Sequence, residues 1–140
     1  MRLEIFMEEL FPVPIERVWE ALTDSSMIDR WLMRTDGFEA RAGTRFSLRD
    51  TPREDCRAQV ECEVLEVSPP HRMVWAWQGA DDPATTRLVI ELESDSQGTR
   101  LKLSHTGEAD ERTVRGTTAG WTAKLRALVE LLNKEGGTQQ

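Results

Sequence analysis

His105 is the side chain with the clearest capacity for chemistry in this sequence, because it closes the apolar face of a predicted strand. In the stretch GTRLKLSHTG, residues 98–107, Leu101, Leu103 and His105 fall on one side of a period-two alternation, with Arg100 and Lys102 on the other. Successive strand residues point to opposite faces of a sheet, so the imidazole should face inward. Three roles are open to it: a structural hydrogen-bonding group, a polar group that orients a ligand hydroxyl or carbonyl, or a general acid–base.

Tryptophans supply most of the other candidate site residues. The chain has five tryptophans and no tyrosine, and an indole combines a large apolar area with one N–H donor, which suits the wall of a ligand pocket. Ordinary core packing is the alternative. The candidate ligand-binding residues, chosen by shared strand or helix face, are Trp31, Phe46, Leu48, Trp75, Trp77, Leu88, Ile90, His105, Thr117, Trp121 and Leu125. We expect the ring of His105 to lie within reach of Trp121 or Thr117 and to be neutral at pH 7, because burial without an acid partner disfavours the charged form.

The remaining titratable residues indicate no further site. Pairs such as Glu61 with Glu63 fall on polar strand faces, and His71 lies in a turn. Cys56 and Cys62 are six residues apart in one predicted strand, about 20 Å at ~3.3 Å per residue, which is too far for a disulfide. We expect both cysteines to be small buried residues of a cytosolic protein. No nucleophile-with-base motif, phosphate-binding loop, dinucleotide fingerprint or zinc signature appears, so we predict no catalytic residue, no metal and no cofactor.

Periodicity predicts the elements that position these residues. Residues 2–10 alternate as a strand, and two short helices follow, the first entered through Pro14 and the second capped by Ser25 or Ser26. Six more strands are predicted at 37–42, 44–50, 56–67, 72–78, 86–94 and 99–106. A long last helix ends at Gly136 and carries one apolar stripe, made of Val114, Thr118, Trp121, Leu125, Leu128 and Leu132.

This order of elements predicts an α+β fold. Short turns between the strands require antiparallel pairing, and the stripe of the long helix must be buried against the concave face of the sheet. We therefore predict a seven-stranded antiparallel sheet around a long C-terminal helix. The prediction is one domain over residues 1–135, with a flexible tail at 136–140.

Five segments, taken in order, resemble one family. They are FPVPIERVWEALTD, IDRWL, VLEVSPPHRMVWAW, GTRLKLSHTG and the GW of AGWTAKLRALVELL. Over about residues 3–134 the chain resembles the activator of heat-shock-protein-90 ATPase homologue-like branch of the START-like (SRPBCC) superfamily. The resemblance implies a helix-grip fold with an apolar pocket between sheet and helix. Glu108 and Ala109 depart from the large apolar residues that often follow the family's H-x-G. The co-chaperone activity in the family name belongs to members with an additional domain.

Composition and the resemblance together predict the function. The net charge of −7 argues against a nucleic-acid partner, since phosphates demand a basic face. We expect no membrane span and no secretory signal. The leading hypothesis is a cytoplasmic, cofactor-free binding protein, monomeric or homodimeric, for a small hydrophobic molecule such as a lipid or polyketide. The alternatives are a cyclase- or hydratase-type enzyme that uses His105 as acid–base, and a protein-interaction module related to the stress-response co-chaperone.

Overall fold

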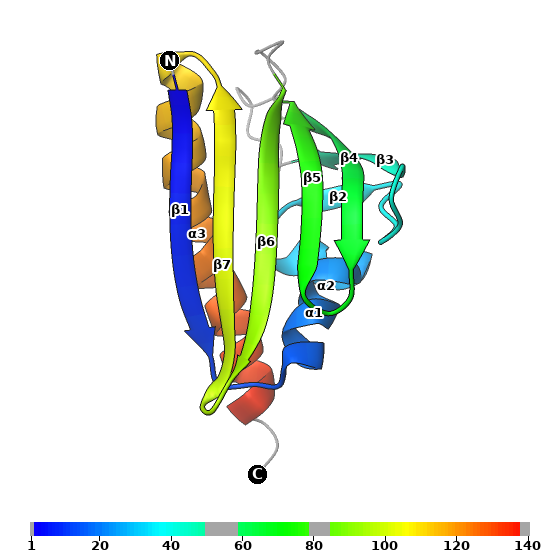
Figure 1. Ribbon diagram of the computed structural model, residues 1–140, viewed down its shortest axis with the longest axis vertical. Helices are drawn as coiled ribbons and strands as arrows, with labels where there is room; N and C mark the ends of the chain where they lie inside the picture. Colours follow the sequence, from blue (N-terminus) through cyan, green and yellow to red (C-terminus); the bar gives the residue numbers. More distant parts are fainter. Residues whose placement is uncertain (1, 50–58, 79–84, 138–140) are drawn as a thin grey trace.

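The computed structural model describes residues 2–49, 59–78 and 85–137 of the chain. It contains three helices, α1 (Ile15–Thr23), α2 (Ser25–Trp31) and α3 (Glu111–Gly137), and seven strands (Figure 1). The strands are β1 (Arg2–Phe11), β2 (Arg34–Asp36), β3 (Arg45–Arg49), β4 (Gln59–Ser68), β5 (Arg72–Gln78), β6 (Thr86–Asp95) and β7 (Gly98–Glu108).

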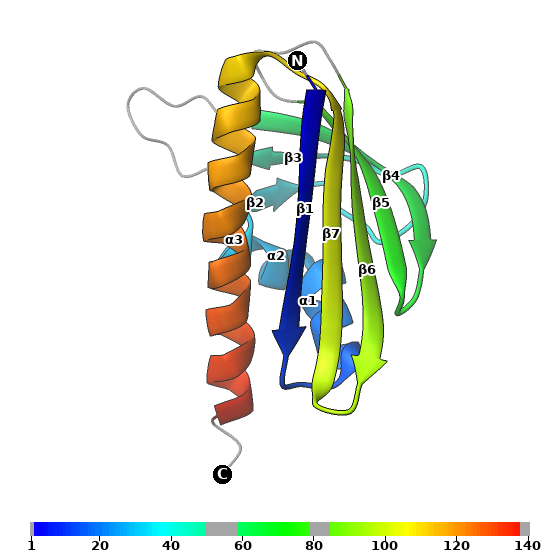
Figure 2. The ribbon, with the colours of Figure 1, turned by 60° about the vertical axis from the view of Figure 1, so that its left-hand side comes forward.

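The strands form one sheet in the order β1-β7-β6-β5-β4-β3-β2, and every neighbouring pair is antiparallel. The chain runs as a meander from β2 to β7, and β1 then pairs with β7 at the far edge. Figure 2 shows all three helices on one side of this curved sheet, with α3 running beside β1 and β7. The predicted α+β helix-grip architecture is confirmed.

The strand predicted at 37–42 is wrong. The second strand is instead the short β2, and the chain turns at Gly37, whose φ of +82° is a conformation that favours glycine. Phe38 is buried through its ring, which meets Phe46 at 4.9 Å and Trp75 at 5.7 Å edge to face. The apolar residue that suggested a strand is therefore held by aromatic packing and not by a ladder of hydrogen bonds.

The helix ends also differ from the prediction. The N-cap of α2 is Asp24, because its carboxylate accepts from the Ser26 backbone N–H at 2.9 Å, whereas Ser25 and Ser26 were expected to cap. Both serines belong to the first turn of the helix. At the other end of the chain, α3 continues through Gly137, so Gly136 does not end it.

One member of the expected helix stripe faces water. Thr118 is exposed, and its hydroxyl donates to the Val114 carbonyl at 2.9 Å. Thr117 is the half-buried residue at this level of the helix, because at ~3.6 residues per turn it lies closer to the face of Trp121. Val114 is half-buried against the core, and the rest of the stripe, including the predicted Leu125 and Leu128, is buried in it.

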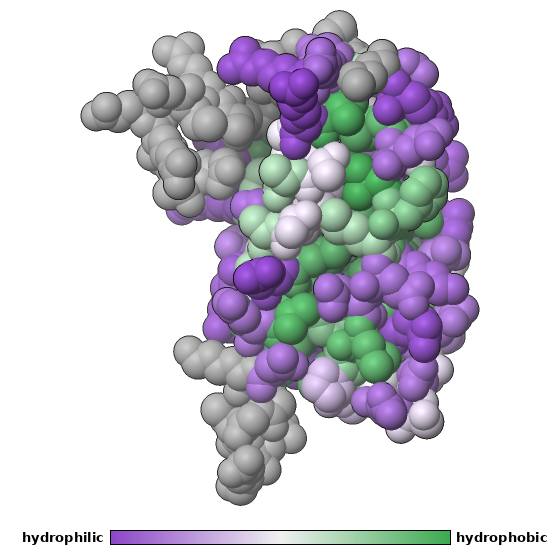
Figure 3. All heavy atoms as spheres, turned by 90° about the vertical axis from the view of Figure 1, so that its left-hand side faces the viewer, coloured by the Kyte–Doolittle hydropathy of each residue, from purple (hydrophilic) through white to green (hydrophobic). Residues whose placement is uncertain are grey.

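The side of the molecule formed by α3 and β1 carries hydrophobic residues along its middle and hydrophilic residues around them (Figure 3). On β1, Leu3 and Ile5 are buried, while Phe6 and Leu10 are exposed, Phe6 to 70%. The alternation of this strand therefore holds at both faces. Phe6 and Leu10 point away from the space between sheet and helices.

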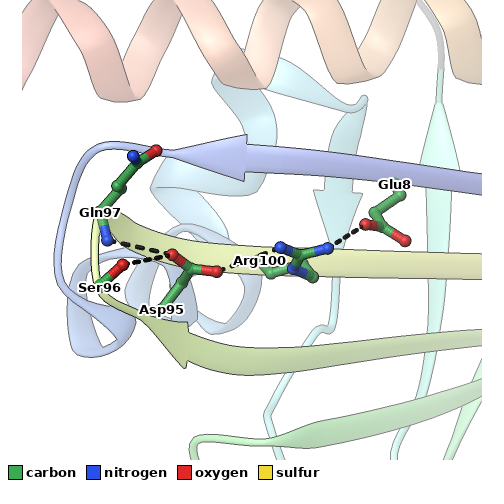
Figure 4. Close-up of polar contacts among 5 residues, drawn as sticks. All are labelled: Glu8, Asp95, Ser96, Gln97 and Arg100. Carbon is green, nitrogen blue, oxygen red and sulfur yellow. Dashed lines mark hydrogen bonds and ion pairs between the residues drawn. The ribbon is translucent and has the colours of Figure 1, made fainter.

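A polar cluster ties the edge strand to its neighbour at the β6–β7 turn. Arg100 donates to Glu8 on β1 at 2.7 Å and to Asp95 at 3.2 Å (Figure 4). The hydrogen bond from the Gln97 backbone N–H is the largest cause that lowers the pKa of Asp95, and the hydrogen bond from Arg100 lowers it further. These pairs are partly exposed and worth little individually, and they are compatible with the β1–β7 register, which places His105 opposite Ile5.

Candidate functional site

Glycines at both ends of the stretch 98–107 let β7 run close to its neighbours. Gly98 has φ +143°, and a Cβ there would lie 2.0 Å from the Phe11 carbonyl oxygen. Gly107 has φ +147°, and a Cβ there would lie 2.9 Å from the side chain of Thr86. Any other residue would collide at these distances. The missing side chain of Gly107 thus brings Thr86 of β6 beside His105 of β7.

His105 sits at the centre of a buried hydrogen-bonded chain. Its side chain is fully buried, and its Nδ1 accepts from the Trp121 indole N–H at 2.9 Å. Because Nδ1 is an acceptor, the neutral ring carries its proton on Nε2, which donates to the Thr86 hydroxyl at 2.7 Å. That hydroxyl donates in turn to the Trp77 carbonyl at 3.1 Å. Every donor and acceptor in this chain has a partner.

The environment of the ring fixes its charge. Burial lowers the pKa of His105 from 6.5 to about 4, since an imidazolium loses its hydration and gains no carboxylate there. The ring is therefore neutral at pH 7, as predicted, and it reaches Trp121, as predicted. Both nitrogens are engaged by side chains, so this geometry favours the structural role among the three considered. The partners are Thr86 and Trp121 and not the loop before α3.

Aromatic rings form two groups on the inner side of the sheet. In the first, Trp77 lies 5.2 Å from His105 and 5.5 Å from Trp121 between ring centroids. In the second, Trp75 meets Phe46 at 4.9 Å and Phe38 at 5.7 Å. Distances of this order and tilted or edge-to-face geometry are favourable for aromatic pairs.

The second group contains a buried polar atom that has no partner in the described part of the chain. Trp75 is only 2% exposed, yet no acceptor within the described ranges reaches its indole N–H. A buried donor left unpaired costs about 1–3 kcal/mol. This N–H is therefore a point at which an acceptor supplied from outside the chain would be stabilising.

The structure gathers the predicted site residues into one core. Trp31 is buried, and its indole donates to the Ala21 carbonyl at 2.8 Å, which fastens α2 onto α1. Thr117 is half-buried on α3. The other predicted residues are all buried in the same hydrophobic cluster or beside it; they are Phe46, Leu48, Trp75, Trp77, Leu88, Ile90, His105, Trp121 and Leu125. Whether any of them contacts a ligand stays a prediction.

A cavity of about 580 Å³ lies where α2 and the start of β2 face β3 and α3. This volume is within the range of small-molecule sites, about 300–1,000 Å³. Of the predicted site residues only Trp31 lines it. The other lining residues were not predicted from the sequence; they are Asp29, Arg30, Leu32, Met33, Arg34, Arg49, Ala123, Lys124 and Ala127. The spacing of Ala123 and Ala127, one turn apart on α3, was the available signal.

Other kinds of site find little support in the described part of the chain. No three His, Cys, Asp or Glu side chains gather there in a way that could hold a metal ion. Cys62 is buried and free, and burial raises the pKa of its thiol, so it behaves as a small apolar residue. Cys56 lies outside the described residues. None of the described helices combines the length and the apolar character needed to cross a membrane.

Comparisons with known proteins place this architecture in a family. The family model described as Activator of Hsp90 ATPase homolog 1-like protein matches residues 12–133. Protein MLL2253 from Mesorhizobium loti has a similar structure, with 28% identity and a TM-score of 0.83 over 94% of this chain and 97% of that one. CV1439 from Chromobacterium violaceum aligns with 22% identity and a TM-score of 0.84 over 92% and 96% of the two chains. No curated protein matches the chain.

DynU16, a putative protein in the dynemicin biosynthetic locus, is a more distant structural relative. It shares 19% identity and a TM-score of 0.76 with this chain, and the alignment covers 94% of this chain and 47% of that one. At this identity the likeness establishes a common fold.

Proposed function

We propose that this chain, which belongs to the family of Activator of Hsp90 ATPase homolog 1-like proteins, binds a small, largely apolar molecule between its sheet and α3. The cavity of about 580 Å³ carries the proposal. This cavity between α2, β3 and α3 opens to solvent and has the volume of a small-molecule site, which supports binding of a molecule larger than water. The dynemicin locus of DynU16 is consistent with ligands made by biosynthetic enzymes.

The unpaired indole of Trp75 adds a polar requirement. Trp75, Phe38 and Phe46 lie outside the cavity lining, so a ligand that extended from the cavity into the core could place a carbonyl or hydroxyl oxygen at this buried N–H and its apolar body against the two phenylalanine rings. Ligand pockets combine apolar walls with a few placed polar groups in this way. We therefore expect an apolar ligand that carries at least one hydrogen-bond acceptor.

The two alternative functions, an acid–base enzyme and a protein-interaction module, have less structural support than ligand binding. An acid–base role would need a free nitrogen on His105 and an ionisable neighbour, whereas its ring partners are Thr86 and Trp121. An interaction module would need a large continuous apolar surface, whereas the described segments expose three large hydrophobic residues, Phe6 and Leu10 on the outer face of β1 and Leu65 on β4. A cytoplasmic location remains part of the proposal.

Native mass spectrometry of freshly purified protein tests the proposal, because a bound ligand adds a defined mass. Titration of the emptied protein with apolar ketones, followed by tryptophan fluorescence, gives the affinity. Trp75→Phe keeps the aromatic body and removes the N–H, so it should weaken binding of a ketone more than binding of the matched hydrocarbon. Trp19→Phe, on the half-buried face of α1, is the control. Absence of a co-purified mass together with absence of saturable quenching would contradict the proposal.

A further inference from the structure

We propose that the ligand of this domain carries an anionic group, a carboxylate or a phosphate, held by Arg34 and Arg49 at the exposed rim of the cavity. The inference rests on the proposed function, because it names the chemistry of the molecule that the cavity would hold. It follows from the charges that line the cavity, from the pairing of β2 with β3, and from the division of the lining into an apolar floor and a cationic rim.

The charge of the lining is opposite to that of the whole chain. The net charge of the protein is −7, yet the cavity is lined by four cations, Arg30, Arg34, Arg49 and Lys124, and by one carboxylate, Asp29. Asp29 is engaged elsewhere, since its Oδ1 accepts from the Thr35 backbone N–H at 2.8 Å and from the Thr35 hydroxyl at 3.0 Å. This carboxylate secures the start of β2. The formal charge of the lining side chains is therefore positive, and of these cations only Arg34 and Arg49 are assigned to the anion.

The two arginines face each other across the ladder of the edge strands. Arg34 and Arg49 are direct register partners of β2 and β3, both are exposed, and neither has an ion-pair partner within residues 2–49, 59–78 and 85–137. Like charges directly opposite each other in a sheet are destabilising. An anion between them would remove the repulsion, and guanidinium groups bind carboxylate and phosphate oxygens through paired N–H donors.

The rest of the lining suits the apolar part of an amphiphile. Trp31 and Leu32 are buried, and Met33 and Ala127 are half-buried. Buried apolar groups and exposed arginines thus belong to one cavity. A molecule with an apolar body and one terminal anionic group matches both parts, whereas a fully apolar molecule would leave the arginine pair unneutralised.

Three probes separate the parts of this proposal: decanoate, 1-decanol and inorganic phosphate. They are titrated into the intact protein in low-salt buffer at pH 7.5, with binding followed by tryptophan fluorescence and calorimetry. We expect decanoate to bind about tenfold or more tighter than 1-decanol, the effect of about 1.5 kcal/mol or more from charge-assisted hydrogen bonds. Phosphate alone should bind much more weakly than decanoate, because it lacks the apolar body.

Substitutions assign the preference to the rim. Arg34→Gln and Arg49→Gln should each weaken decanoate binding about tenfold and leave 1-decanol binding unchanged. Arg41→Gln, which removes an equal charge from a residue outside the cavity lining, should change neither. The melting temperature of the ligand-free protein should stay the same or rise in both rim variants, because a like-charge pair is removed. A protein that merely lost structure would melt earlier.

The outcomes distinguish the two proposals. Equal affinity for decanoate and 1-decanol, or loss of decanoate binding in Arg41→Gln as large as in the rim variants, would overturn the anionic group and leave the apolar ligand standing. Phosphate binding as tight as decanoate binding would also overturn the amphiphile. If neither decanoate nor 1-decanol bound, and no ligand co-purified, the proposed function itself would fail.

Discussion

The buried imidazole of His105 should make the stability of the protein depend on pH in a defined window. The informative change is His105→Gln, because the glutamine carbonyl can accept from the Trp121 indole and its amide can donate to the Thr86 hydroxyl. The variant keeps both polar roles of the ring and removes its titration. Differences between the two proteins in the slope of stability against pH then report the imidazole alone, since the other titrating groups are common to both.

The magnitude follows from the pKa of the ring in the two states. Burial lowers it to about 4 in the folded protein, against 6.5 for an unperturbed histidine. Above pH 6.5 the ring is neutral in both states and costs nothing. As the pH falls below 6.5, His105 becomes protonated in the unfolded chain but stays neutral in the folded protein. The free energy of unfolding therefore declines until the pH reaches about 4, where the folded protein also binds the proton. At 1.36 kcal/mol per pKa unit, the full decline is about 3 kcal/mol.

Urea unfolding between pH 7.5 and 4, followed by tryptophan fluorescence, measures this difference. The free energy of unfolding of the wild type minus that of His105→Gln should fall by about 2–3 kcal/mol across this range, with nearly all of the change below pH 6.5. The difference in the free energy of unfolding at pH 7.5, where the imidazole is neutral in both states, reports only how well glutamine fits in place of histidine. Two parallel stability curves would refute the reasoning, because they would mean that the folded protein accommodates the imidazolium and that the ring is not closed off by Thr86 and Trp121.

Three other changes test the packing around this site. Thr86→Val leaves the His105 Nε2–H and a backbone carbonyl unpaired in the core, so urea unfolding should show a loss of about 1–3 kcal/mol, whereas Thr85→Val at the exposed neighbouring position should be neutral. Leu128→Ala, at a fully buried position of α3, should lower the free energy of unfolding by about 2–5 kcal/mol in the same assay. A loss below about 0.5 kcal/mol would place Leu128 outside the core. Gly120→Ala should raise the melting temperature, because alanine favours a helix by about 1 kcal/mol and the added Cβ meets nothing within 4 Å.

The sheet was predictable because its strands alternate strictly and its turns are short. The failure at 37–42 shows the limit of that signal. An aromatic residue flanked by polar ones is typical of a strand, yet Phe38 is buried by contact with Phe46 of β3 and with Trp75 of β5, the latter distant in sequence. Local alternation cannot distinguish a residue in a ladder from a residue in a turn that reaches the core.

The placement of His105 was predictable in part. Strand parity indicated that the ring faces α3 within reach of Trp121 or Thr117, and the structure confirms the inward orientation and the contact with Trp121. Its second partner, Thr86, was not predictable, because the contact depends on the close approach of β6 to Gly107. The cavity could not be predicted from the sequence for a related reason, because a cavity forms where side chains of different elements do not meet. Residues such as Arg34 and Arg49 line it only because α2 packs against α3.

The two aromatic groups divide the inner face into a closed part and an open part. Around His105 each hydrogen-bonding atom has a partner, so a ligand bound there would have to break a bond to make one. At Trp75 a donor is buried and unpaired, and its neighbour Phe46 lies on β3 three residues before Arg49 of the cavity rim. That separation is about 10 Å along the strand at ~3.3 Å per residue, and because three residues is an odd spacing, Phe46 faces the core while Arg49 lies on the other face, exposed. Affinity and selectivity should therefore respond most directly to changes at Arg34 and Arg49, which line the cavity, while changes at His105 should act through stability.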